Sequence, residues 1–353
     1  YKRQGSVRTQ GARHTFNDAD AAISALRSKD VEMVVGAIPF DSDTPAALTV
    51  PEAIIREEGP LEPHAYYRNQ SLSSRVVGFD PEPEEHLRRV EAAIGTIETS
   101  KLEKVVLARA VDIEFPEAID PRLVAARLID LSANRDGFIA DLSPAGRPGA
   151  MLVGSSPEVL VKRQGLTVSA FPLAGSSPRR ALAAEDHLAG QDLLHSSKDL
   201  HEHAFVVDHL RRALTPLCER LDIPDVPQLI STNEMWHLGT PISGTLKDKD
   251  LTALELALAV HPTPAICGTP AEAAQALIET AETDRGFYAG AVGWCDSSGD
   301  GEFMVAIRCA EVAGDGLSAR AWAGGGIVGD SDAQAELEET TAKLRTILKA
   351  LSL

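Results

Sequence analysis

The sequence repeats one order of elements in two stretches of the chain. Residues 104–177 contain five short apolar runs separated by turn residues, and they end in a glycine-containing segment, PLAGSS. Residues 286–323 contain three further runs, which lead into the glycines of WAGGGI. Strands joined by short turns pair antiparallel, whereas parallel strands need long crossovers. The spacing therefore predicts an α/β fold built on two antiparallel meanders.

Each predicted meander precedes a helix that carries two acidic residues three positions apart. The helical run at 185–214 contains Asp199 and Glu202, and the helix near the C-terminus contains Glu336 and Glu339. Residues at positions i and i+3 share one face of a helix. If the two helices face each other, their carboxylates form the hard oxygen set that suits Mg²⁺. The repeat therefore favours a magnesium site.

The C-terminal helix also has a simpler interpretation. We expect it to begin at Ser331, with Gln334 completing a capping box. Lys343 follows Glu339 by one turn, so the two side chains can form a helical ion pair on a solvated face. The glycines at 324–326 favour a ligand site instead, because backbone without side chains can approach a ligand closely.

Composition limits the class of protein. The chain has 353 residues, 44% of them hydrophobic, which is enough for one large domain or two smaller ones. Its net charge of -18 argues against nucleic acid or an anionic membrane as a partner, since both require a basic face. The four cysteines form no CxxC pair, and no run is long enough to span a membrane. We expect a cytoplasmic protein.

Several single residues are candidates for chemistry. Lys104 begins an apolar run, and Glu158 directly follows Pro157, although charged residues at strand ends usually lie on the surface. His261 precedes a turn stiffened by prolines, which either presents it to a pocket or leaves it as a helix cap. Arg308 lies within an apolar run and needs an anionic partner if it is buried.

Eight segments together carry a family resemblance. They are KVVLARAV, GSSPEVLV, PLAGSSPRR, KDLHEH, HPTPAICG, FYAGAVGWCD, VAIRCAEV, and AGGGIV through ELEETTAKL, with GAIPFD as a weaker match upstream. In this order they resemble the chorismate-utilising enzymes, most of all the isochorismate synthases of siderophore pathways. The resemblance implies one domain over 1–353, with 1–100 as a less characteristic part and 100–350 as the catalytic part. It also implies two stacked antiparallel sheets flanked by helices.

The resemblance implies an enzyme that acts on chorismate, a dicarboxylate, and that needs Mg²⁺ as cofactor. Glu202 and Glu339 resemble the metal ligands of the family, and Asp199 and Glu336 the acidic residues beside them. The remaining pocket positions are expected to bind the substrate. This set is Gly175, Ser176, His261, Ala265, Tyr288, Ile307, Arg308, Gly324 and Lys343.

Two further residues resemble the acid–base pair of the family. Lys104 matches the general base that activates water, and Glu158 the general acid that protonates the departing hydroxyl. A lysine acts as a base near neutral pH only if burial or a neighbouring cation lowers its pKa from about 10.4. The 4-hydroxyl of chorismate is a poor leaving group, so the acid needs a raised pKa to protonate it. We expect a closed pocket around both.

The subtype rests on three positions. Ala265 and Ile307 resemble the synthases that release isochorismate, whereas Tyr288 resembles the salicylate synthases, which go on to expel pyruvate. The alternatives are thus a salicylate synthase and, outside enzymology, a non-catalytic Mg²⁺-binding module. Either pathway, siderophore or menaquinone biosynthesis, can use isochorismate. The resemblance implies a monomer with no glutaminase subunit.

Overall fold

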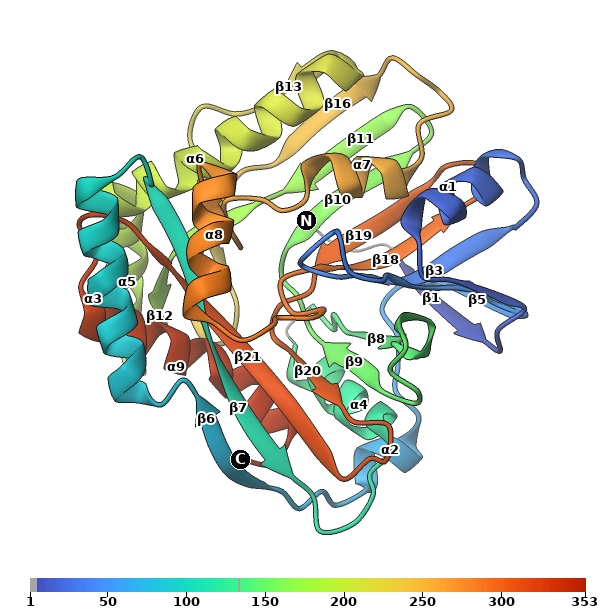
Figure 1. Ribbon diagram of the computed structural model, residues 1–353, viewed down its shortest axis with the longest axis horizontal. Coiled ribbons are helices and arrows are strands. Elements are labelled where there is room, and N and C mark those ends of the chain that lie inside the picture. Colours follow the sequence, from blue (N-terminus) through green and yellow to red (C-terminus); the bar gives the residue numbers. More distant parts are fainter. Residues whose placement is uncertain (1–4, 133) are drawn as a thin grey trace.

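The computed structural model describes residues 5–132 and 134–353, which form two large antiparallel sheets and two small ones (Figure 1). Strands of the first 100 residues take part in both large sheets, since β3 (Met33–Ile38) pairs with β18 (Ala291–Asp296) and β6 (Arg75–Asp80) pairs with β7 (Lys104–Glu114). In order across the nine-stranded sheet, the strands are β13 (Cys218–Asp222), β16 (Ile242–Leu246), β11 (Thr167–Phe171), β10 (Val159–Gln164), β19 (Gly301–Val305), β18 (Ala291–Asp296), β3 (Met33–Ile38), β4 (Ala47–Val50) and β2 (His14–Phe16).

The second large sheet has seven strands and is built on the long pair β7 and β21. Its order is β17 (Gly268–Thr269), β7 (Lys104–Glu114), β21 (Ser318–Ile327), β20 (Cys309–Val312), β9 (Met151–Gly154) and β8 (Phe138–Asp141), and β6 (Arg75–Asp80) pairs with the same edge of β7 as β17. The small sheets are β12 (Leu173–Pro178), β15 (Met235–Gly239) and β14 (Gln228–Ser231), and β1 (Gly5–Gln10) with β5 (Ala53–Glu58).

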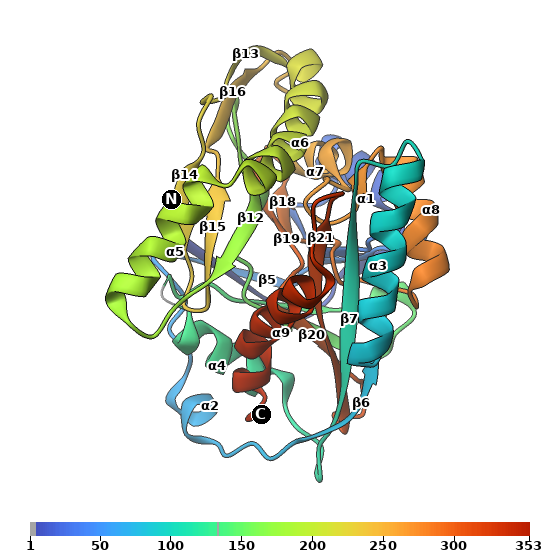
Figure 2. The same cartoon turned by 90° about the vertical axis from the view of Figure 1, so that its left-hand side faces the viewer.

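The helices flank the sheets. Figure 2 shows α9 beside α3 against β7 and β21, and α9 also packs on α4. On α9, Leu344 and Ile347 are buried, and burying a side chain of this size stabilises the fold by about 1.5–3 kcal/mol. The helices are α1 (Ala19–Arg27), α2 (Ala65–Asn69), α3 (Pro83–Thr99), α4 (Pro121–Leu131), α5 (Ala183–His195), α6 (Ser197–Leu214), α7 (Ala253–Val260), α8 (Ala271–Ala281) and α9 (Ala333–Ala350).

The hydrophobic core has two parts. The larger part joins the two large sheets, and it includes Leu107 of β7, Val161 of β10 and Val305 of β19. The smaller part lies between the other face of the seven-stranded sheet and the helices α4 and α9. The expected fold of stacked antiparallel sheets with flanking helices is therefore confirmed.

The two meanders were predicted wrongly in one respect. Neighbouring runs pair as β8 with β9, β10 with β11, β18 with β19 and β20 with β21. The chain changes sheet between β9 and β10, at 155–158, and again between β19 and β20, at 306–308. The pattern of apolar runs and turns is the same for a strand that stays in its sheet and one that crosses over, because pairing is set by distant residues.

Two helix boundaries also differ from the prediction. The run at 185–214 is two helices, because Ser196 leaves the helical conformation and its hydroxyl accepts a bond from Asp199 N as the N-cap of α6. The last helix begins at Ala333, and its N-cap is Asp332, whose side chain accepts from Ala335 N. Ser331 instead bonds the Glu336 carboxylate (Oγ–Oε1 2.7 Å).

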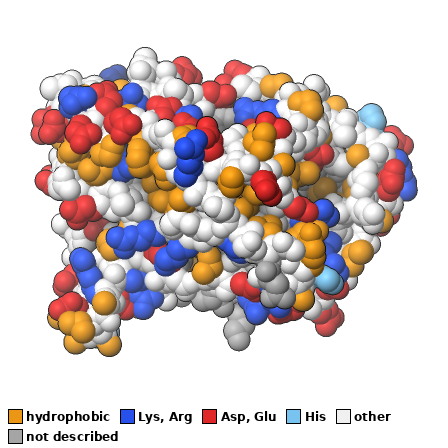
Figure 3. Space-filling model, turned by 90° about the horizontal axis from the view of Figure 1, so that it is seen from below, with side chains coloured by type: hydrophobic (Ala, Val, Ile, Leu, Met, Phe, Trp, Pro, Cys, Tyr) orange, Lys and Arg blue, Asp and Glu red, His pale blue; other side chains and the backbone are white. Residues whose placement is uncertain are grey.

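The surface carries charges of both signs. Figure 3 shows one face, on which acidic and basic side chains lie interspersed among exposed hydrophobic ones. The net charge of -18 is therefore not gathered into a single acidic area on this face. Among the residues described, no helix is long and apolar enough to cross a membrane.

Candidate active site

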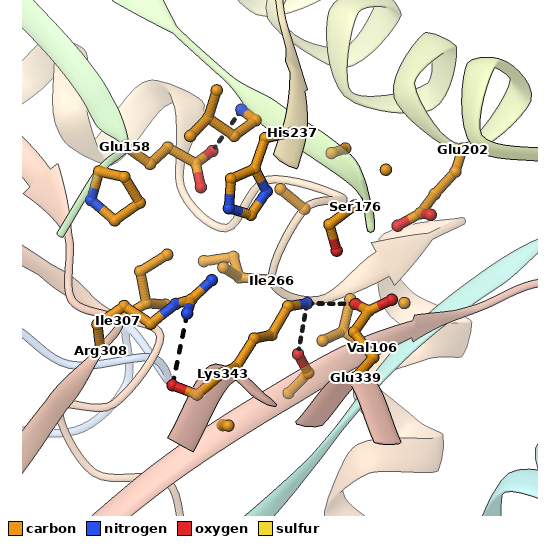
Figure 4. A pocket seen from close by; sticks show the side chains of 18 of the residues that line it. Val106, Glu158, Ser176, Glu202, His237, Ile266, Ile307, Arg308, Glu339 and Lys343 are labelled. Atoms are coloured by element: carbon orange, nitrogen blue, oxygen red, sulfur yellow. Dashed lines mark hydrogen bonds and ion pairs between the residues drawn. The ribbon is translucent and has the colours of Figure 1, made fainter. Parts of the chain in front are cut away.

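A single pocket collects most of the predicted site residues from eight separate segments of the chain (Figure 4). The predicted residues that line it are Glu158, Gly175, Ser176, Glu202, Ala265, Tyr288, Ile307, Arg308, Gly324, Glu339 and Lys343. Gly326, one of the three glycines expected to lie at a ligand site, also lines it. Further lining residues, which the sequence did not indicate, are Val106, Pro157, Leu173, Ala174, His237, Ile266, Trp322 and Ala323.

The two sheet-crossing segments bring Glu158 and Arg308 into this pocket. They run side by side, because Ser155 N donates to Arg308 O (3.1 Å) and Val305 N donates to Glu158 O (3.2 Å). Arg308 therefore lies between two strands and not inside one, and it takes a left-handed φ of 53°, which is uncommon for a residue with a side chain. The change of sheet is thus what turns both side chains toward the pocket.

Glu158 has the environment that a general acid requires. Its side chain is buried, and its Oε1 accepts a bond from Leu173 N (3.3 Å). Burial disfavours the charged carboxylate and raises the pKa of Glu158 to about 7, despite opposing effects of that hydrogen bond and of Lys104, Lys343 and Arg308. A large fraction of this group is consequently protonated at neutral pH.

Two cations face Glu158 across the pocket. Arg308 is buried, and its Nη1 donates to the backbone oxygen of Lys343 (3.4 Å). Lys343 Nζ donates to Gly324 O (3.0 Å) and to Glu339 Oε1 (2.5 Å), as Figure 4 shows. Burial by itself would raise the pKa of Glu339, but the Lys343 ammonium lowers it below the usual value for glutamate. The predicted helical pair is present, and it faces the pocket instead of solvent.

Lys104 does not line this pocket itself, but it contacts Glu202, which does. It is fully buried at the start of β7, and its Nζ lies 2.9 Å from Glu202 Oε1. Gly326 leaves the space for this pair, because a Cβ at this position would lie 2.2 Å from Glu202 Oε1 and 3.0 Å from Lys104 Cε. The glycine is thus required by the carboxylate and the lysine that pack on it.

We expect Gly326→Ala to disturb this pair while leaving the rest of the pocket in place. The added methyl group must displace the Glu202 carboxylate, and overpacking of a buried site typically costs about 1–3 kcal/mol. Thermal unfolding should show the lower stability, and turnover should fall in the same variant. Gly95→Ala in α3 is the matched control, since its Cβ would meet nothing within 4 Å. Equal stability and turnover in the two variants would contradict this account.

The four predicted metal ligands lie on facing parts of α6 and α9, but each carboxylate has another partner in this structure. These partners are Lys104 for Glu202, Lys343 for Glu339, Lys198 for Glu336 (Nζ–Oε1 2.9 Å) and the Ser196 hydroxyl for Asp199 (2.5 Å). Within the described ranges, no three acidic, histidine or cysteine side chains form a group that could hold an ion as they stand.

The chemistry of these residues nevertheless fits Mg²⁺, which prefers oxygen ligands. Glu336 Oε2 is buried and, among the residues described, has no hydrogen-bond partner. Burial, and then the nearby Glu339 carboxylate, raise the pKa of Glu336 to about 7. A Cβ at Gly325 would lie 3.1 Å from that same oxygen, so the glycine gives it room. The neighbouring lysines therefore leave part of the negative charge of these carboxylates uncompensated, and a divalent cation would compensate it.

His261 was predicted to bind the substrate, but the structure places it outside the set of residues that line this pocket. It caps the end of α7, and its Nε2 lies 3.0 Å from Phe40 O. His237 of β15 lines the pocket instead, and burial lowers its pKa well below the usual value for histidine. His237 was not among the predicted site residues, although a polar residue within the apolar run MWHLG was a signal for it.

One wall of the pocket is aromatic. Tyr288 and Trp322 stack with ring centroids 5.7 Å apart and planes at 11°. Gly324 makes room for the tyrosine, because a Cβ there would lie 2.9 Å from its hydroxyl. Burial raises the pKa of Tyr288, so its hydroxyl stays protonated and can donate a hydrogen bond.

Comparisons with known proteins give consistent results. The sequence profile of the family described as chorismate binding enzyme matches residues 33–352. The chain is 45% identical to a Mycobacterium tuberculosis protein provisionally named isochorismate synthase MenF, over 99% of this chain and 94% of that protein. It is 44% identical to isochorismate synthase DhbC of Bacillus subtilis, over 90% and 80%.

A solved structure agrees with these sequence matches. It is a crystal structure from Bacillus anthracis, provisionally described as the 2,3-dihydroxybenzoate-specific isochorismate synthase DhbC. The two folds superpose with a TM-score of 0.91 at 37% identity, covering 100% of this chain and 95% of the other. The resemblance that the motifs indicated is therefore confirmed.

Proposed function

Because this chain belongs to the chorismate-binding enzyme family, we propose that it is an isochorismate synthase, which isomerises chorismate to isochorismate. One observation of the site supports this most directly. The buried carboxyl group of Glu158, with a pKa of about 7, faces the same pocket as the cations Arg308 and Lys343. A proton donor and binding groups for a dicarboxylate are thus combined in one enclosed space.

The proposed reaction exchanges one hydroxyl group for another. Water adds to C2 of the ring and gives up a proton to Lys104, the ring double bonds shift, and the hydroxyl at C4 leaves with a proton from Glu158. The product has the same atoms as the substrate, and no covalent intermediate is needed. Arg308 and Lys343 would hold the carboxylates of the substrate, because charge-assisted bonds to carboxylates are short and strong. Tyr288 and Trp322 would contribute an apolar surface against which the ring of the substrate can pack.

We propose Mg²⁺ as the cofactor, held by Glu202 and Glu339 with Glu336 and Asp199 beside them. When bound, the ion would neutralise a substrate carboxylate and fix the position of the ring. The Lys104–Glu202 contact supports this proposal for a further reason. Glu202 lines the pocket and already faces a cation at 2.9 Å, the Nζ of Lys104, so its carboxylate would be one of the groups to hold the ion.

Removal of divalent cations should abolish turnover reversibly. The purified protein is treated with EDTA, exchanged into metal-free buffer and assayed with chorismate while Mg²⁺ is added back. We expect activity to return with a saturable dependence on Mg²⁺. Glu339→Gln should shift this dependence to higher Mg²⁺, and Glu338→Gln, one residue away and outside the pocket, should not. Full activity in metal-free buffer would exclude the proposed cofactor.

The product formed from chorismate distinguishes an isochorismate synthase from a salicylate synthase and from a non-catalytic protein. Purified protein is incubated with chorismate and Mg²⁺, and the products are separated by chromatography. We expect isochorismate, with no ammonia source and no glutaminase subunit needed, because the incoming group is water. Salicylate with pyruvate as the main products would assign the chain to the salicylate synthases, to which Tyr288 was likened. No turnover at all would favour a non-catalytic binding module. The proposed setting is the cytoplasm, in siderophore or menaquinone biosynthesis.

A further inference from the structure

A second, smaller cavity lies beside the seven-stranded sheet and shares Trp322 with the pocket described above. It sits at the edge of β7 between the partners of that edge, since β6 pairs up to Ala110 and β17 pairs only with Lys104 and Val105. The intervening stretch of edge is held by side chains instead of a strand. Ala108 N donates to Glu282 Oε1 (2.7 Å), and Arg285 Nη2 donates to Val106 O (2.7 Å).

Arg109 is the unusual residue of this cavity. It is only 3% exposed, and its Nη1 donates to the hydroxyls of Thr340 (3.4 Å) and Thr341 (3.1 Å). Its Nε has no hydrogen-bond partner, and it forms no ion pair, within the part of the chain that the structure describes. Burial lowers the pKa of Arg109, and the charge of Glu82 partly opposes this, so the observation concerns the unpaired Nε and not an isolated charge. A buried donor without an acceptor costs about 1–3 kcal/mol in general. A buried guanidinium in this state therefore points to a partner from outside the chain.

Arg89 of α3 provides a second guanidinium at the same cavity. Its Nε lies 3.2 Å from Glu85 Oε1, but its Nη1 is buried and has no hydrogen-bond partner among residues 5–132 and 134–353. Both arginines influence His86, which is buried beside them. Burial, followed by the charges of Arg109 and Arg89, lowers the pKa of His86 to about 4. The histidine is thus neutral at physiological pH. The charged groups of the cluster are the two arginines and the carboxylates near them, Glu85 beside Arg89 and Glu82, whose charge acts on Arg109.

The acidic residues that line the cavity already have partners. Glu282 forms two hydrogen bonds with Arg285 (2.8 Å each), and Asp80 pairs with Arg320 and accepts from Thr283 (2.7 Å). Burial by itself would raise the pKa of Asp80, but its bonds to Thr283 and Arg320, together with the charge of Arg89, lower it, so Asp80 also compensates part of the Arg89 charge. The lining holds three arginines against two carboxylates, and among the residues described Arg89 Nη1 and Arg109 Nε are donors without an acceptor.

We propose that Arg89 and Arg109 bind a small inorganic anion in this cavity, outside the substrate pocket. Guanidinium groups donate several hydrogen bonds in a fixed plane, which suits phosphate oxygens and also accommodates a halide ion. Trp322 forms a wall of both cavities, and Arg285 lies over the rings of Phe40 and Tyr288 (4.6 and 6.0 Å to the centroids). An anion bound here would therefore lie next to Trp322, which also lines the substrate pocket.

The test is a calorimetric titration of the full chain, without substrate, in HEPES buffer free of both probes. Chloride and inorganic phosphate are the two probes, titrated separately. We expect one saturable site for at least one of them, and Arg109→Gln or Arg89→Gln should weaken binding at least tenfold. Arg88→Gln is the matched control, because Arg88 is exposed, neighbours Arg89 and also pairs with Glu85 (2.7 Å). Its binding should equal that of the wild type.

Arg308→Gln separates this cavity from the substrate pocket, whose cations can also bind anions. Binding should persist in Arg308→Gln, and loss of binding there, together with retention in Arg109→Gln, would overturn the proposal. Absence of saturable binding of either probe by the wild type would overturn it as well. If Arg109→Gln does not fold, the test uses Arg89→Gln alone, because Arg89 is partly exposed and its replacement should be tolerated. Neither readout depends on turnover, so failure of the proposed enzyme activity leaves this test intact.

Discussion

Replacing Lys104 with methionine is expected to lower kcat for chorismate isomerisation by about 10²- to 10⁴-fold, the usual contribution of a general base. Methionine fills a similar volume but cannot accept a proton from water. It also leaves Glu202 without its lysine, so thermal unfolding must be measured beside the kinetics. The assay follows isochorismate formation at saturating Mg²⁺. Unchanged KM with a much lower kcat would indicate loss of the chemical step and not of binding.

Lys101→Met is the matched control for this substitution. Lys101 lies three residues earlier, is exposed and has no part in the pocket. Its kinetics and stability should equal those of the wild type. If Lys104→Met folds and turns over within about threefold of the wild type, Lys104 is not the base.

Replacing Glu158 with glutamine is expected to have an effect of similar size, about 10²- to 10⁴-fold on kcat. Glutamine keeps the shape and can still accept the bond from Leu173 N, but it carries no acidic proton. The fold should therefore be retained, which thermal unfolding at pH 6 checks. Glu302→Gln on β19, whose carboxylate lies 3.8 Å from Lys162 Nζ outside the pocket, is the control. If Glu158→Gln turned over at a rate near that of the wild type, Glu158 would not be the proton donor.

The pH dependence of the wild type provides a second test of Glu158. A general acid works only while protonated, so turnover should fall as the pH rises through about 7, the pKa of this group. The free energy of unfolding should also fall as the pH rises through this range. The folded pKa lies above the usual value of 4.5, so the folded state holds the proton more tightly than the unfolded chain. The contribution of Glu158 to the free energy of unfolding is fully present below about pH 4.5 and is lost as the pH rises through about 7.

Thermal unfolding of the wild type and Glu158→Gln at pH 5.5 and 8 measures this contribution. The wild type should lose stability relative to the variant at the higher pH, by an amount on the order of 2 kcal/mol. Glu336 titrates in the same range in both proteins, so its contribution cancels. A stability difference that is independent of pH would show that Glu158 is ionised in the folded protein at both values.

Local sequence was sufficient for most elements and for the content of the site. The helix at 83–99 and the strand that begins at Lys104 follow from side-chain periodicity, which acts over a few residues. Glycines 324–326 were expected to leave space for a ligand, and in the structure they leave it for Tyr288, Glu336 and Glu202. His261 and His237 could not be told apart from sequence, because whether a histidine faces a pocket depends on the strands and loops packed around it.

The sequence by itself determined which residue types the site contains, since the acid pairs, the glycines and the charged residues at strand ends are local patterns. Only the tertiary structure decided how they are used. Glu158 and Arg308 become neighbours because two segments cross between the sheets side by side, a pairing of residues about 150 positions apart that no local pattern encodes. Burial in that enclosed pocket then raises the pKa of Glu158, because desolvation depends on everything packed around a group.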